Sequence, residues 1–125
     1  MMLMDRFLDA IQDIKKKKPT YRLTGTGTDG TCDCIGLIIG AIRRIGVSWK
    51  GDDKHPAIHG SNYAARYQVR DLKYISSLSQ LSLGDAVFKA RGSGESKYSL
   101  PSRYKSGGGY YNGDLKDYYH VGVVT

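Results

Sequence analysis

An apolar segment that directly follows a glycine-rich loop constrains the fold of this chain more than any other feature. Residues 28–46 read TDGTCDCIGLIIGAIRRIG, and the aliphatic residues after Cys34 cover nearly every face of a helix. A helix that is apolar all round belongs in a core. Gly46 follows the last of these residues and favours the end of the helix. We therefore predict a buried central helix that begins near Cys34 and ends before Gly46.

Two glycines interrupt the predicted helix four residues apart. Gly36 and Gly40 lie on one face, and small residues at this spacing let a second backbone come close. The same spacing occurs in dimers of membrane helices, but this segment is shorter than the roughly 20 apolar residues that span a bilayer. We expect a close backbone contact inside the domain instead.

Cys34 falls in the first turn of this helix. Unpaired N–H groups and the positive end of the helix dipole favour a thiolate there, and the same N–H groups could hold an oxyanion. Asp33 suits the N-cap position, which is a structural role. A lone cysteine is also commonly a buried structural thiol, so the segment alone leaves both interpretations open. For Cys32 we expect a small buried apolar side chain, because a disulfide between residues two apart is strained.

Composition narrows the functional classes. The chain has 125 residues, which suits one domain spanning residues 1–125. Its formal net charge of +7 favours anionic surroundings, such as nucleic acid, anionic lipid or a bacterial wall rich in phosphate and carboxylate groups. Two cysteines exclude a disulfide framework, and two thiols with three scattered histidines make a poor zinc site. We expect neither a metal nor a cofactor.

The N-terminal residues 1–18 predict an amphipathic helix docked on the domain. Apolar residues recur on one helical face, four lysines follow them, and Pro19 ends the helix. Acidic residues interrupt the apolar ones, so the segment is not a Sec signal peptide. Three localisations therefore remain open: the protein is delivered in a phage virion or tail, is released by a holin, or acts in the cytoplasm.

Three motifs follow one another along the chain. After Tyr21 and the glycine-rich loop come D-C-I-G-L at 33–37, L-S-L-G-D-A-V-F at 81–88 and H-V-G-V-V at 120–124. This order resembles the NlpC family of bacterial papain-like cysteine peptidases, whose pattern runs Tyr, Gly-rich turn, D-C-S-G-L, L-x-P-G-D-L-V-F and H-V-G-I. The resemblance covers residues 21–125. It implies an α+β, papain-like fold in which a central helix carrying the cysteine packs on a small antiparallel sheet carrying the histidine.

The resemblance also implies roles for individual residues. Cys34 would be the nucleophile, His120 the general base, and Tyr21 a group near the oxyanion. Asp33, Tyr110 and Tyr111 are further candidates for oxyanion or substrate contacts. The implied reaction hydrolyses peptidoglycan stem peptides between D-glutamate and the diamino acid, through a thioester acyl-enzyme and without a metal. Ile35 departs from the family, which has serine after the cysteine.

A third catalytic group is missing from the pattern. In the family, a His, Asn or Gln on the strand after H-V-G-I orients the imidazole, and this sequence ends at Thr125. We therefore expect the C-terminal strands to be missing, and a further chain segment or partner to complete the sheet. His55 and His59 precede the second motif, in a polar segment before a short helix near residues 61–67. We expect both to be surface loop histidines.

The connection at residues 91–117 is rich in Gly, Ser and Tyr and carries several basic residues. We expect a flexible inserted loop without an ordered core, between a strand at 86–90 and the neighbouring strand that carries His120. The loop could instead be a lid over the cleft between Cys34 and His120.

Two alternatives to the peptidase remain. The basic and tyrosine residues of this loop suit the stacking surface of a non-catalytic nucleic-acid-binding module. Related papain-like folds also act as amidases, acyltransferases or transpeptidases, which share the acyl-enzyme step and differ in the acceptor.

Overall fold

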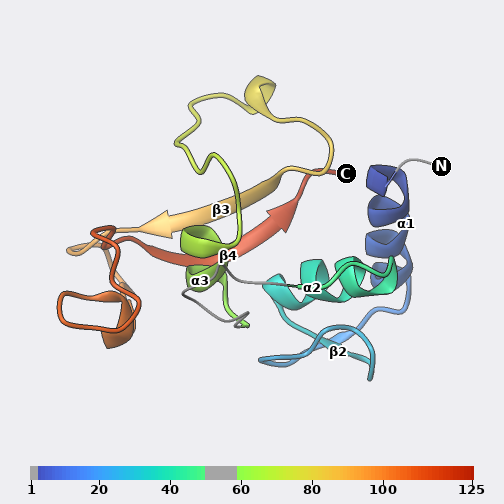
Figure 1. Ribbon diagram of the computed structural model, residues 1–125, viewed down its shortest axis with the longest axis horizontal. Coiled ribbons are helices and arrows are strands. Elements are labelled where there is room, and N and C mark those ends of the chain that lie inside the picture. The colour runs from blue at the N-terminus through green and yellow to red at the C-terminus, as the bar shows by residue number, and fades with distance from the viewer. Residues whose placement is uncertain (1–2, 50–58) are drawn as a thin grey trace.

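The computed structural model describes residues 3–49 and 59–125. Helices and strands mix along this part of the chain, which makes the fold α+β as the sequence predicts (Figure 1). The elements in chain order are α1 (Leu3–Lys16), β1 (Thr20–Tyr21), β2 (Thr31–Cys32), α2 (Cys34–Arg44), α3 (Ser61–Tyr67), the 3₁₀ turn η1 (Leu78–Gln80), β3 (Ala86–Arg91), the 3₁₀ turn η2 (Ser102–Tyr104) and β4 (Asp117–Val123).

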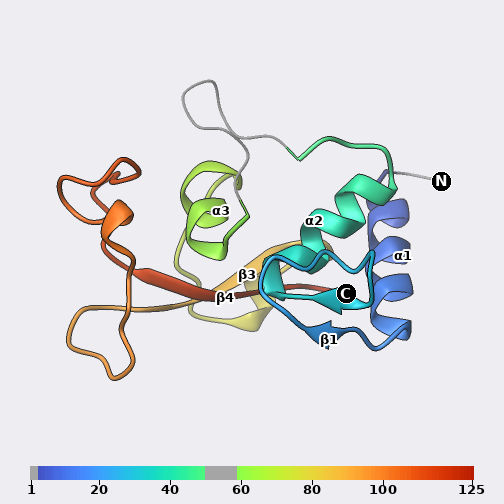
Figure 2. The ribbon, with the colours of Figure 1, turned by 90° about the horizontal axis from the view of Figure 1, so that it is seen from below.

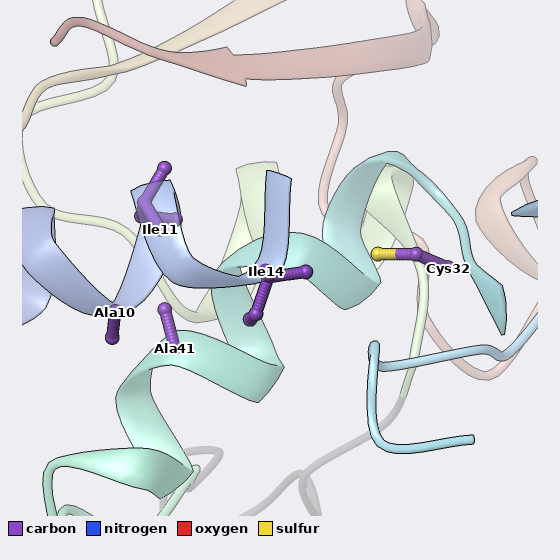
Figure 3. Close-up of a cluster of buried hydrophobic side chains, with 5 residues drawn as sticks. All are labelled: Ala10, Ile11, Ile14, Cys32 and Ala41. Atoms are coloured by element: carbon purple, nitrogen blue, oxygen red, sulfur yellow. The ribbon is translucent and has the colours of Figure 1, made fainter. Parts of the chain in front are cut away.

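The N-terminal helix α1 packs against α2, as its amphipathic pattern predicts. Ala10, Ile11 and Ile14 are buried together with Ala41 of α2 and Cys32 of β2. Figure 3 shows this cluster, in which the side chain of Cys32 is directed toward Ile14. Lysines occupy the last turn of the helix, where cations interact favourably with the negative end of its dipole. The expected structural role of Cys32 as a small buried side chain is confirmed.

Helix α2 is buried on two sides, which explains its unusual apolarity. Ala41 belongs to the cluster shared with α1, whereas Ile35, Ile38 and Ile39 pack with Val121 of β4. The helix ends at Arg44, and Gly46 follows with φ of +82°, a left-handed conformation that glycine adopts without a steric penalty. The prediction of a buried central helix ending before Gly46 is confirmed.

The glycines of α2 lie against the backbone of the glycine-rich loop. A Cβ atom added to Gly36 would lie 1.7 Å from the carbonyl oxygen of Gly25, and one added to Gly40 would lie 2.0 Å from that of Thr26. The predicted close backbone contact is therefore confirmed, and it wraps the loop around the start of α2. Across residues 3–49 and 59–125, no helix is long and apolar enough to cross a membrane.

Strands β3 and β4 form an antiparallel pair, and both α2 and α3 contact β4 (Figures 1 and 2). The register pairs Phe88 with Val121 and Lys89 with His120, and then shifts so that Ala90 pairs with Tyr118. Tyr119 is thus the extra residue of a bulge, a feature that re-aims side chains locally. The expected pairing of the 86–90 strand with the strand of His120 is confirmed. A separate parallel pair joins β1 to β2.

The connection between β3 and β4 is anchored to α3 by tyrosines. Leu100 and Tyr104 are buried with Tyr63 of α3, and Tyr104 is only 1% exposed. The expectation that glycine and serine leave no ordered core here is wrong, because the few large side chains of the segment gather on one helix. An ion pair of 2.9 Å between Arg91 and Asp117 links its two ends.

Arg66 of α3 also fixes this connection. Its guanidinium lies 4.8 Å from the ring centre of Tyr104 and 5.2 Å from that of Tyr118. It donates hydrogen bonds of 2.8 Å to the carbonyl oxygens of Asp114 and Lys116. One planar cation thereby joins α3, η2 and the chain entering β4.

The close contact at Gly40 gives a stability prediction. Replacing glycine by alanine inside a helix normally stabilises it by roughly 1 kcal/mol. At Gly40 the added methyl group meets backbone, which has little freedom to move. We therefore expect Gly40→Ala to lower the free energy of unfolding by about 1–3 kcal/mol, measured by urea denaturation.

Gly122→Ala is the matched control. A Cβ atom at Gly122 meets no atom within 4 Å, so this variant should unfold close to the wild-type midpoint. A Gly40→Ala protein as stable as Gly122→Ala would contradict the close packing of the loop on α2.

Candidate active site

Cys34 is the first residue of α2, and the preceding residue caps the helix. Asp33 adopts an extended conformation, and its Oδ1 accepts a hydrogen bond of 2.6 Å from the backbone N–H of Gly36. The predicted N-cap is confirmed. Cys34 itself is half-buried, whereas Asp33 is only 8% exposed. The thiol therefore lies where helix N–H groups and the helix dipole favour a thiolate, and it is accessible.

The Asp33 carboxylate also fixes the glycine-rich loop. Its Oδ2 accepts a hydrogen bond of 2.9 Å from the backbone N–H of Thr24. The backbone N–H of Asp33 in turn donates to the carbonyl oxygen of Gly25 at 3.1 Å. The loop and the first turn of α2 are thus held together at the residue beside Cys34.

His59 is the third group bound to this carboxylate. Its Nε2 lies 2.8 Å from Oδ1 and 2.7 Å from Oδ2 of Asp33, and its side chain is 21% exposed. His59 lies in a loop, as expected, but its ring is partly buried against Asp33 and is not a free surface group. His55 lies outside the described residues. Sequence reasoning missed the contact because the two residues are 26 positions apart and no pattern links them. Only the placement of His59 just before the predicted helix at 61–67 hinted at an ordered position.

A cavity of about 300 Å³ opens beside Cys34. Asp33 and His59 line it together with Cys34, and Tyr21 contributes from β1. Arg103 and Tyr104 of η2 and Tyr119 of β4 line it from the other segments. The structure therefore brings Tyr21, Asp33 and Cys34 to one cavity. The lining also includes His59, Arg103 and Tyr119, which sequence reasoning did not assign to the site.

His120 lies on β4 opposite Lys89, and its side chain is exposed. Its neighbour Val121 packs on α2, and successive side chains of a strand point to opposite faces. His120 is therefore directed to the other face of the sheet from Val121. Tyr119 lines the cavity beside Cys34, whereas His120 is not among the lining residues. The pairing of Cys34 with His120 remains a prediction.

The two other tyrosine candidates lie away from this cavity. The ring of Tyr110 packs against Tyr63 with 5.3 Å between ring centres, and Tyr111 is exposed. Neither lines the cavity beside Cys34. From the same connection, Arg103 and Tyr104 line it instead, and Tyr104 is also buried against Tyr63 of α3.

The two cysteines differ in their electrostatic surroundings. Burial raises the pKa of the Cys32 thiol above its ordinary value, and the nearby charge of Asp33 raises it further. Both cysteines are free thiols. Within residues 3–49 and 59–125, no group of three or more His, Cys, Asp or Glu side chains is placed to hold a metal ion.

No family model, curated protein or solved structure matches this chain. The assignment of chemistry therefore depends on the residues of the site and on the three motifs of the sequence.

The contrast between the cysteines gives a reactivity prediction. A buried thiol with a raised pKa holds less thiolate near neutral pH, so Cys32 should react with iodoacetamide more slowly than the half-buried Cys34. We expect Cys34 to be labelled at least about 10-fold faster at pH 7, as measured by tandem mass spectrometry of the peptide containing both residues. Equal labelling of the two cysteines in the folded protein would contradict this picture of the site.

Proposed function

We propose that this protein is a cysteine hydrolase that cleaves an amide bond in the stem peptides of bacterial peptidoglycan. One observation carries the proposal: an accessible thiol at the capped N-terminus of a buried helix opens into a cavity that also contains an imidazole. A nucleophile, positioned N–H groups and an imidazole are the parts that acyl transfer requires. The NlpC resemblance supports the same chemistry from the sequence.

The proposed reaction begins at the Cys34 thiolate. The thiolate attacks the amide carbonyl carbon, and N–H groups at the start of α2 stabilise the oxyanion, with the Tyr21 hydroxyl nearby. A histidine takes the thiol proton and passes it to the leaving amine. Water then hydrolyses the thioester and restores the thiol. The resemblance assigns the role of this histidine to His120.

A papain-like arrangement is part of the proposal. The described fold offers a cysteine at the start of the central helix α2, which packs on β4 of an antiparallel pair. In the proposed arrangement this pair is the core of the sheet that carries His120.

The substrate assignment is supported by charge. The chain is basic overall, and Arg103 contributes a guanidinium to the cavity beside Cys34. A stem peptide carries carboxylate groups that a guanidinium recognises. The resemblance specifies the bond between D-glutamate and the diamino acid. This substrate is compatible with delivery in a phage particle, with release through a holin and with action in the cytoplasm.

An amidase or acyltransferase would use the same acyl-enzyme and differ in what accepts the acyl group. The nucleic-acid-binding alternative is disfavoured by the packing of the tyrosines. Tyr104 is buried, and Tyr98 and Tyr110 pack around the cluster formed with Tyr63. These rings contact one another and α3, so they do not form an open stacking platform.

Replacement of the nucleophile tests the proposal. We expect Cys34→Ala to reduce hydrolysis of purified stem peptides by at least about 1,000-fold, because Cys34 is the thiol among the described residues that line the cavity. Product release is measured by chromatography and mass spectrometry.

Cys32→Ala is the matched control. It removes the neighbouring thiol from the core cluster and should keep most of the activity. Circular dichroism and thermal melts establish that both variants fold. Wild-type hydrolysis by folded Cys34→Ala would overturn the proposed function.

A further inference from the structure

The histidine that serves Cys34 is the least defined part of this site. The described chain contains two candidates: His120, exposed on β4, and His59, bonded to Asp33. We propose that His59, oriented by Asp33, is the proton acceptor for the Cys34 thiol. This inference rests on the proposed function, and it assigns the catalytic imidazole to a residue outside the three motifs.

The hydrogen bonds of Asp33 determine which nitrogen of His59 accepts a proton. An ionised carboxylate only accepts hydrogen bonds, so Nε2 of His59 must carry the hydrogen that binds Asp33. In the neutral ring the lone pair is then on Nδ1. The carboxylate fixes the tautomer and the direction of the ring, which is what an orienting group does for a catalytic base.

Asp33 is itself held in place, so it can orient His59. Backbone N–H groups of Thr24 and Gly36 donate to its two oxygens, one to each. These bonds tie the carboxylate to the glycine-rich loop and to the first turn of α2. His59 is thereby fixed relative to the helix that begins with Cys34. Asp33 acts as a positioning residue in this arrangement.

The other ionisable groups of the cavity do not compete for the role. The lining contains the carboxylate of Asp33, the guanidinium of Arg103 and the hydroxyl groups of Tyr21, Tyr104 and Tyr119. A guanidinium and tyrosine hydroxyl groups are not proton acceptors near neutral pH. Asp33 already accepts three donors. Among the described residues that line the cavity, His59 is the group with a basic lone pair.

The proton balance is complete without another reactant. The Cys34 thiol gives its proton to Nδ1 of His59, and the thiolate forms a bond to the substrate carbonyl carbon. The C–N bond breaks as the imidazolium returns the proton to the leaving amine. In the second half, His59 takes a proton from the attacking water, the C–S bond breaks, and the thiol regains its proton.

The His59→Gln variant removes the catalytic nitrogen and keeps the structural hydrogen bond. The amide nitrogen of His59→Gln occupies nearly the position of Nε2 and can still donate to Asp33, but it leaves no basic nitrogen. His120→Gln tests the competing histidine on β4, to which the resemblance assigns the same role. Both substitutions are made in the Cys32→Ala protein, so that iodoacetamide reports on Cys34 alone.

The measurement is the alkylation rate of Cys34 between pH 5 and 9. We expect His59→Gln to lower the rate at pH 6.5 by at least about 10-fold, because no imidazole then takes the thiol proton. His120→Gln should lower the rate less than His59→Gln does, because this inference assigns the proton to His59. An unchanged profile in His59→Gln, or a loss confined to His120→Gln, would overturn the inference.

A second measurement avoids any change at position 59. The NMR ring resonances of His59 should differ between the wild type and Cys34→Ser, and those of His120 should not, because the proposal pairs His59 alone with Cys34. Identical His59 resonances in both proteins would overturn the inference.

Peptide hydrolysis by the same variants separates this inference from the proposed function. If alkylation of Cys34 depends on His59 but the wild type does not hydrolyse stem peptides, the pairing of Cys34 with His59 is supported and the proposed substrate is rejected. Hydrolysis that needs Cys34 and His120 but tolerates His59→Gln supports the proposed function and rejects His59 as the base.

Discussion

The carboxylate of Asp33 is the point at which three parts of the chain meet. It accepts hydrogen bonds from Thr24 in the glycine-rich loop, from Gly36 in the first turn of α2 and from His59 before α3. Burying a charge is costly unless it is fully hydrogen-bonded, and these donors offset that cost. Removing the carboxylate would leave the buried backbone N–H of Gly36 unpaired, at a cost of roughly 1–3 kcal/mol. The position of Cys34 depends on this junction.

Helix α2 gives the junction its rigidity. Its apolar side chains pack toward α1 on one side and toward β4 and α3 on the other, so its first residue has little freedom to move. Gly36 and Gly40 bring the loop backbone into contact with the helix, which leaves Asp33 within reach of Thr24. The tight packing of the residues that follow Cys34 and the accessible thiol at the first residue are therefore consequences of the same apolar, glycine-containing segment.

Local patterns were sufficient to predict much of this structure. The apolar run predicted α2, its cap at Asp33 and its end before Gly46. The G-D-A-V-F segment predicted a strand paired with the strand of His120. The ordered packing of Leu100 and Tyr104 was not predictable, because it depends on which face of α3 those side chains meet. The bond between His59 and Asp33 is likewise a long-range contact without a periodic signature. The bulge at Tyr119 also arises only from strand pairing.

The central claim is that Cys34 forms a covalent acyl intermediate. The most direct test is to quench the protein with acid during turnover of an activated ester of a stem peptide and to map the added mass by tandem mass spectrometry. The account predicts an acyl group on Cys34 that hydroxylamine removes, as expected for a thioester. Turnover with no acyl group on the protein, or with the group on another residue, would contradict it.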